Sequence, residues 1–131
     1  LKAGLEISAA DYLKAMRIRS LMQNAFRDLF ALTDVLLAPS RLAPANPIDQ
    51  PLDRPASDRP TPSTPGLTAL IPAGNLAGLP ALSLPCGFAD RMPIGIQLVG
   101  RPFSENTLLM LGRRFQERTD FHKRRPPLSA G

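Results

Sequence analysis

The chain has very little of several residues on which whole classes of protein depend. It contains one cysteine, Cys86, and one histidine, His122, so it can form neither an internal disulfide nor a metal site built from Cys and His. Tryptophan is absent and aromatic residues make up 5% of the chain, which leaves an aliphatic core. No apolar run approaches the roughly 20 residues that span a bilayer, and no basic-then-apolar leader opens the sequence. We therefore expect a cytoplasmic protein with no membrane contact, no metal and no cofactor.

What the chain does contain is enough apolar material for one folded unit. Hydrophobic residues account for 44% of the 131 residues, and this length allows one domain at most. The formal net charge is +5, a balance that would permit binding to RNA or to an acidic surface. The only dense basic run is Lys123–Arg125, which we expect to be a solvated tail. Nucleic-acid binding is therefore permitted by the charge but not indicated by its distribution.

The first third of the sequence predicts a long helix followed by a strand. Ser8 and Asp11 have the S-x-x-D spacing of a helix start. Apolar residues then recur at helical spacing as far as Leu32, which predicts a helix that is heavily buried in its second half. The apolar run Val35–Ala38, closed by Pro39, is typical of a strand covered on both faces.

A proline-rich excursion follows, at about residues 40–66. Seven prolines occur in these 27 residues, interleaved with Asp, Arg, Ser and Thr, so neither a helix nor a central strand can run through it. A stretch of this length without regular structure is usually a functional lid, a segment covered by a partner, or disordered. We expect it to be poorly ordered in this chain alone.

The second half of the sequence predicts a hairpin and a final helix. Thr68–Ile71 favours a short helical turn, and Ala81–Pro85 and Pro93–Val99 favour two strands, joined as an antiparallel hairpin through Gly87–Met92. Ser104 is a candidate N-cap for a helix that runs to about Thr119. Its side chains are assigned to an inward stripe (Leu108, Leu111, Phe115) and an outward ion pair (Arg113 with Glu117).

Four blocks of sequence form a pattern that is specific because of their order and separation. They are Asn75–Gly87 (NLAGLPALSLPCG), Met92–Phe103 (MPIGIQLVGRPF), Asp34–Pro39 and Thr119–His122. Together they closely resemble the C-terminal part of the amidase-signature hydrolases, a family that includes the glutamyl-tRNA amidotransferase A subunit. The resemblance implies that residues 1–131 are the C-terminal portion of an amidase domain. It also implies an α/β fold, a fragment of a mixed-sheet α/β/α architecture with about three strands flanked by two long helices.

The resemblance implies a chemistry that this chain cannot perform alone. Members of the family hydrolyse amides with a serine, a second serine in a cis peptide and a lysine, which must be neutral to act as the base. This sequence has no G-G-S-S-type run and no two adjacent serines, and its lysines are Lys2, Lys14 and Lys123, near the termini or on a polar helix face. We therefore expect no catalytic residue here, and we expect the nucleophile to lie in an N-terminal catalytic half that precedes Leu1.

Other candidate site residues have a structural interpretation beside a functional one. Cys86 and His122 could be imagined as a nucleophile and its base. Cys86 follows an apolar strand, which favours a buried inert thiol, and His122 beside Asp120 favours a partly exposed structural histidine. Asn75 and Gln97 either contact a pocket or the absent half, or satisfy the backbone of the turn and sheet. The remaining motif residues favour turns and close packing over ligand binding: Gly78, Pro80, Pro85, Gly87, Pro93, Gly95 and Gly100.

The interpretation of the whole chain is therefore a structural segment of an amide hydrolase, inactive by itself. Its first expected partner is the absent catalytic half. Its exposed sheet also predicts a homo-oligomer, because bare strand edges pair with other copies. The alternatives left open are a non-enzymatic RNA- or protein-binding module on a shortened amidase scaffold, and a proteolytic or truncated remnant without activity.

Overall fold

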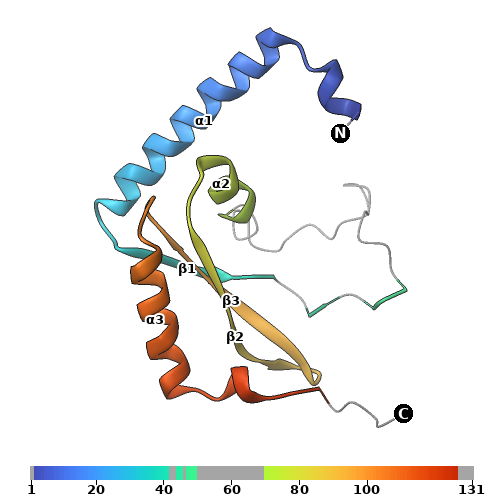
Figure 1. The fold of residues 1–131 in the computed structure, drawn as a ribbon, viewed down its shortest axis with the longest axis vertical. Coiled ribbons are helices and arrows are strands. Elements are labelled where there is room, and N and C mark those ends of the chain that lie inside the picture. The colour runs from blue at the N-terminus through green and yellow to red at the C-terminus, as the bar shows by residue number, and fades with distance from the viewer. Residues whose placement is uncertain (1, 42–43, 46, 50–69, 127–131) are drawn as a thin grey trace.

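The fold is α/β, with one small sheet and helices around it (Figure 1). The structure, a computed structural model, describes residues 2–41, 44–45, 47–49 and 70–126. In chain order the elements are η1 (Lys2–Glu6), α1 (Ala9–Phe30), β1 (Val35–Pro39), α2 (Leu70–Ala77), β2 (Ala81–Ala89), β3 (Met92–Gly100), α3 (Glu105–Arg118) and η3 (Phe121–Lys123). The three strands form an antiparallel sheet in the order β1-β3-β2. The predicted fold class, with three strands and two long helices, is confirmed.

Helix α1 begins as the sequence predicts. The Ser8 hydroxyl accepts a hydrogen bond from the Asp11 amide at 3.1 Å and donates one to its carboxylate at 2.7 Å. The predicted burial of its second half is wrong, because Phe30 is the one buried residue of the helix. Helix α1 projects beyond the sheet (Figure 1) and contacts α2 through residues near its middle, Arg19 and Gln23. Its apolar residues are left in contact with solvent: Tyr12, Leu13, Ile18, Leu21 and Leu29.

Strand β1 differs from its prediction in environment. It pairs with β3 alone and therefore forms an edge of the sheet. Its two faces are also not both covered, contrary to what the apolar run predicts. The side chain of Leu37, at its centre, is 66% exposed. The apolar run therefore identifies the strand correctly, while its cover is absent from the described residues.

Helix α2 is longer than the predicted turn at Thr68–Ile71, of which Thr68 lies outside the described residues. It continues through Pro72 because proline is tolerated in the first turn, where its missing N–H has no partner within the helix. It ends at Gly78, whose φ is +79°. There the amides of Gly78 and Leu79 donate to the carbonyls of Asn75 and Gly74, at 3.2 and 3.0 Å, which is the Schellman arrangement.

The antiparallel hairpin is confirmed, but both strands are longer than predicted and the connection is shorter. Only Asp90 and Arg91 turn the chain, both with positive φ (49° and 66°), as a two-residue hairpin turn requires. The register shifts between Pro85 and Gly87. Cys86 is therefore an extra residue in β2, a β-bulge that increases the local twist.

Helix α3 packs on one face of the sheet and completes the main apolar cluster. Leu84, Leu98 and Leu108 form its buried centre. Leu111 lines the apolar cavity between α3 and the sheet together with Phe115, on the inward side as predicted, but it is less buried than expected, at 37% exposed. The buried residue on this part of the helix is Gly112, where an added Cβ would lie 2.6 Å from a Leu82 methyl. A glycine allows the helix to approach the sheet closely.

The ends of α3 follow the prediction in one respect and not in another. The ion pair of Arg113 with Glu117 is confirmed at 2.9 Å, and Arg114 adds a second at 3.0 Å. Hydrogen bonds from Arg113 and then Arg114 hold the pKa of Glu117 below its ordinary value. The Ser104 hydroxyl, in contrast, caps no helix amide; it donates to the Arg101 carbonyl at 2.7 Å.

The proline-rich excursion lies mostly outside the described residues. Positions 42–43, 46 and 50–66 are not described, so the expected lack of order there stays a prediction. The next described element is α2, which begins at Leu70.

Candidate functional site

The motif residues gather at the end of α2 and along the β2–β3 hairpin. Asn75 lies exposed on α2 and Gly78 caps that helix. The hairpin carries the others: Pro85 and Gly87 on β2, and Pro93, Gly95, Gln97 and Gly100 on β3, with Pro80 just before β2. Pro85 pairs with Gly95 across the strands, and the Pro80 carbonyl accepts from the Gly100 amide at 3.1 Å. The structure thus brings together residues that the sequence separates.

A hydroxyl pair crosses the middle of the sheet over Gly95. Ser40 and Ser83, from segments on either side of β3, place their hydroxyl oxygens 2.9 Å apart. A Cβ at Gly95 would lie 3.1 Å from the Ser40 hydroxyl and 3.3 Å from the Leu84 carbonyl. Glycine at this position therefore leaves room for the contact. Sequence reasoning missed this pair, because it depends on the register of all three strands.

Gln97 lies beside this pair, opposite Ser83 on β2 and Ala38 on β1. Its Oε1 atom is buried and accepts no hydrogen bond within the part of the chain that the structure describes. Buried acceptors are normally satisfied. The Oε1 atom thus lacks the hydrogen bond that the structural interpretation of Gln97 anticipated.

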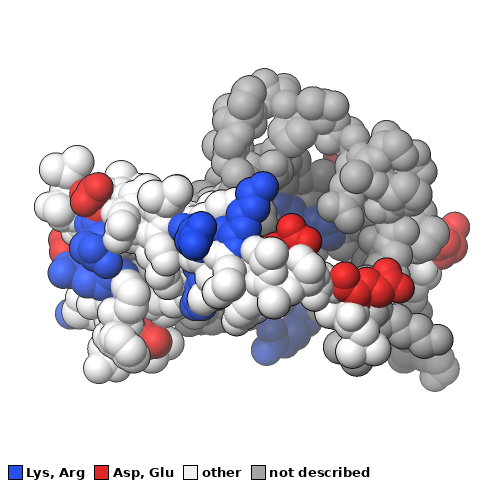
Figure 2. All heavy atoms as spheres, turned by 90° about the horizontal axis from the view of Figure 1, so that it is seen from above, with Lys and Arg blue, Asp and Glu red and all other residues white. Residues whose placement is uncertain are grey.

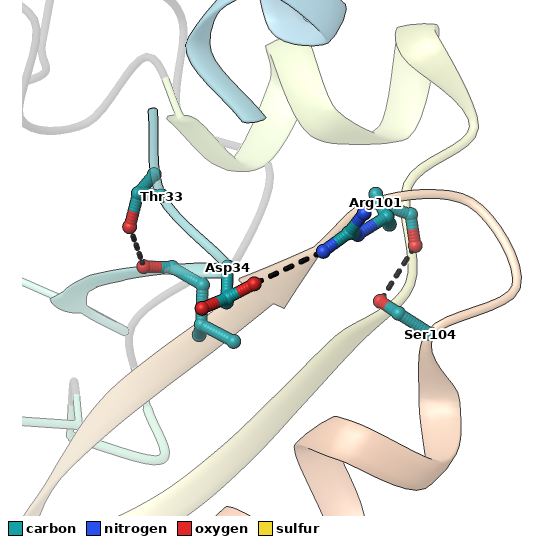
Figure 3. A network of polar contacts seen from close by, with 5 residues as sticks. Thr33, Asp34, Arg101 and Ser104 are labelled. Atoms are coloured by element: carbon teal, nitrogen blue, oxygen red, sulfur yellow. Dashed lines mark hydrogen bonds and ion pairs between the residues drawn. The ribbon is translucent and has the colours of Figure 1, made fainter. Parts of the chain in front are cut away.

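A polar network joins the segment that precedes β1 to the segment that follows β3 (Figure 3). Arg101, just after β3, donates to Asp34, just before β1, at 3.0 Å. The Ser104 hydroxyl donates to the Arg101 carbonyl at 2.7 Å, and the Thr33 hydroxyl donates to the Val35 carbonyl at 3.2 Å. Both partners of the ion pair are well exposed, so it contributes at most about 1 kcal/mol. Its role is positional.

Helix α1 is tied to α2 by two side chains that reach its last carbonyls. Arg19 donates to the Leu76 carbonyl at 2.8 Å and Gln23 to the Ala77 carbonyl at 3.0 Å. Next to them lies a cavity of about 560 Å³, with Phe26 and Phe30 among its lining residues. The cavity has the volume of a small-molecule pocket, but it is bounded by the helices and the connection after β3, not by a catalytic cluster.

The described residues do not assemble the machinery of amide hydrolysis. Lys14 and Lys123 are exposed, so neither is held in the buried position beside a hydroxyl that the base of such a hydrolase needs. Within the described part of the chain, no amine or imidazole is hydrogen-bonded to the hydroxyls of Ser40 and Ser83. The Ser–Ser contact therefore has no candidate base hydrogen-bonded to it among the residues described.

Cys86 and His122 do not form a hydrogen-bonded pair. Cys86 is a half-buried free thiol at the bulge of β2. His122 packs in η3 with its Nδ1 atom buried and without a partner among the described residues. A base that activates a thiol must be hydrogen-bonded to it, so this geometry does not support the nucleophile interpretation.

The described residues offer neither a metal cluster nor a membrane span. In residues 2–41, 44–45, 47–49 and 70–126, no group of three or more His, Cys, Asp or Glu side chains could hold a metal ion. None of the helices described is long and apolar enough to cross a bilayer.

Charge is mixed on the face seen from above. Figure 2 shows Lys and Arg side chains interspersed with Asp and Glu on this side, without a continuous basic stripe. A nucleic-acid surface normally presents a basic patch or stripe. This face therefore does not favour the RNA-binding alternative.

Comparison with known proteins identifies the family. The family model described as Amidase matches residues 2–109. The chain belongs to the amidase family. It is 43% identical over 122 residues to the glutamyl-tRNA(Gln) amidotransferase A subunit of Synechococcus sp., covering 91% of this chain and 22% of that protein. It is 40% identical over 120 residues to the same subunit of Methanosarcina mazei, covering 88% and 23%.

Solved amidase structures share the fold. A crystal structure of an amidase superposes with a TM-score of 0.71 at 28% identity, over 88% of this chain and 26% of the other. The glutamyl-tRNA(Gln) amidotransferase A subunit of Thermotoga maritima gives a TM-score of 0.62 at 26% identity, over 84% and 23%. This amidase-family chain thus spans about a quarter of the length of its relatives. The resemblance drawn from the four sequence blocks is confirmed.

Proposed function

We propose that this chain is the C-terminal, sheet-completing segment of an amide hydrolase, and that it hydrolyses no amide by itself. The observation that carries the proposal is the combination of family membership with coverage of about a quarter of each relative. The serine, cis-serine and lysine that the family uses are then supplied by a catalytic part outside these 131 residues. The motif residues from Asn75 to Gly100 serve the packing of that assembly.

A graft tests this proposal. In the amidotransferase A subunit of Synechococcus sp., the segment that matches this chain is replaced by the chain itself, and ammonia release from an amide substrate is measured. We expect the graft to hydrolyse the amide and the isolated chain to release no ammonia. Amide hydrolysis by the purified isolated chain, lost on denaturation, would refute the proposal, and so would a folded graft without activity.

The proposed partners follow from the surfaces that the described residues leave open. The first is the catalytic part of the parent. In its absence we expect the chain to form homo-oligomers through its exposed sheet, because unpaired strand edges and apolar surface promote association. Light scattering across a concentration series tests this, and a strictly monomeric species at high concentration would contradict it. The cytoplasmic location stays a prediction, to be checked by fractionation.

The alternative is a binding module that uses the amidase scaffold to hold RNA or a protein. The net charge of +5 and the glutamyl-tRNA(Gln) of the relatives' name favour tRNA as the ligand to try. Phosphate contacts would make the association constant fall steeply with salt. No binding of tRNA at low ionic strength would remove this alternative.

A further inference from the structure

The sheet has two outer edges, and the register shows which backbone groups point away from each. The Ser40 amide donates to the Gly95 carbonyl at 2.9 Å, and successive residues of an antiparallel strand point to opposite sides. In β1, Val35 and Leu37 therefore direct their N–H and C=O groups away from β3. On the other side, the Gly100 amide donates to the Pro80 carbonyl. Alternate residues of β2, beginning with Ala81, therefore direct their N–H and C=O groups away from β3.

The outer edge of β2 is protected against further pairing. Its outward-pointing residues are Ala81, Ser83 and Pro85, and Pro85 has no N–H to donate. The bulge at Cys86 then interrupts the ladder, and bulges and prolines are the devices with which proteins close a sheet edge. Beyond the bulge, the ring of Phe88 packs with Phe121 of η3, with centroids 6.3 Å apart.

The outer edge of β1 carries no such device in its middle. Its one proline, Pro39, is the last residue of the strand. Beside β1, on the α3 side of the sheet, lies an apolar cavity of about 470 Å³ lined by Val35, Leu37, Leu98 and Phe115. Because Leu37 is 66% exposed, this side of β1 lacks the cover that α3 gives to the other two strands.

The rim of this cavity is basic. Arg114 and Arg118 of α3 line it together with the apolar side chains. Arg114 is paired with Glu117, whereas Arg118 has no ion pair with another described residue. A segment that fills the cavity would therefore present apolar side chains and an acidic one, which complements the charge of the rim.

We propose that β1 is the edge at which the catalytic part of the parent amidase continues the sheet. An extended strand of that part pairs with the outward amides of Val35 and Leu37 and with the Leu37 carbonyl, since the Val35 carbonyl already accepts from the Thr33 hydroxyl. The polypeptide next to it fills the cavity between β1 and α3. The occupant is the rest of the parent because about three quarters of each relative lies outside the match. This inference rests on the proposed function and adds the place where the two parts of the parent meet, the outer edge of β1, which we call the joint.

Hydrogen exchange in the same graft tests the location at single-amide resolution. The outward amides of Leu37 on β1 and Ser83 on β2 are compared within the same molecule, so each is the control of the other. We expect the Leu37 amide to exchange about 100-fold more slowly than that of Ser83, because only a paired amide is protected. A matched pair of substitutions, Leu37→Pro and Ala81→Pro, removes one outward donor from each edge. We expect Leu37→Pro to lower the melting temperature of the graft more than that of the isolated chain, and Ala81→Pro to lower both equally.

The outcomes separate the two proposals. An active graft in which Leu37 exchanges as fast as Ser83, or in which Ser83 is the protected amide, overturns the joint at β1 and leaves the proposed function intact. Protection of Leu37 that disappears on dilution assigns the edge to a second copy and also overturns the joint. A folded graft without activity overturns both proposals. Protection of Leu37 that persists on dilution supports the joint.

Discussion

Replacing Gly78 by alanine tests the end of α2 with a result whose sign is fixed by the backbone. Gly78 has a φ of +79°, in the left-handed region, where a Cβ costs about 1–2 kcal/mol. The added Cβ would lie 3.6 Å from an Arg19 nitrogen, an ordinary contact, so the cost is conformational and not steric. Alanine also restricts the unfolded chain, which returns about 0.4–1 kcal/mol. We therefore expect Gly78→Ala to lower the free energy of unfolding by about 1 kcal/mol.

The matched control lies four residues earlier in the same helix. Gly74 has a helical backbone, and a Cβ there would meet nothing within 4 Å, so alanine should stabilise the helix by up to about 1 kcal/mol. Urea denaturation followed by circular dichroism gives both free energies of unfolding, and thermal scans should differ between the variants by several degrees. If Gly78→Ala were as stable as the native chain, or if both variants shifted in the same direction, the assigned left-handed cap would be wrong.

Three further predictions concern the core, the α1–α2 contact and acid stability. Leu108→Ala should lower the free energy of unfolding by about 2–5 kcal/mol, because Leu108 is 2% exposed. Leu13→Ala should change it little, because Leu13 is 58% exposed. Denaturant titration compares the two variants, and equal effects would contradict the core assignment. Arg19→Gln should cost about 1 kcal/mol through the lost bond to α2, and the exposed Arg17→Gln close to nothing, as thermal melts will check. Because the pKa of Glu117 is lowered in the folded chain, its ion pairs stabilise the fold above the ordinary pKa of Glu. They stop doing so as the pH falls through the lower folded-state pKa. A carbon-13 NMR titration should give a pKa for this carboxyl below the ordinary value, and an unshifted pKa would contradict the pairing.

The start of α1, the hairpin and the ion pair of α3 were predictable because each depends on residues close together in the sequence. Ser8 and Asp11 are three residues apart, and Arg113 and Glu117 are one helical turn apart. The hairpin turn itself was missed because Asp90-Arg91 lacks the glycine that usually marks positive φ.

The features that escaped prediction depend on segments that are far apart or on cover that the chain lacks. Apolar spacing shows that a face of α1 needs burial, but it cannot show whether the cover lies in the same chain. The bulge at Cys86 and the contact of Ser40 with Ser83 arise from strand register, which no single segment contains. Of the candidate site, the sequence therefore identified the motif residues but not the contacts among them.

The hydroxyl contact across Gly95 makes substitutions at Ser40, Ser83 and Gly95 depend on one another. A Cβ at Gly95 would lie 3.1 Å from the Ser40 hydroxyl and 3.3 Å from the Leu84 carbonyl. Replacing Ser40 by a smaller residue would remove the first of these two contacts and so lower the cost of a side chain at Gly95. The order of substitution matters accordingly: loss of the serine opens a route to a bulkier residue in β3, while the reverse order passes through a strained intermediate. Libraries randomised at these three codons together should recover combinations that single-site libraries do not.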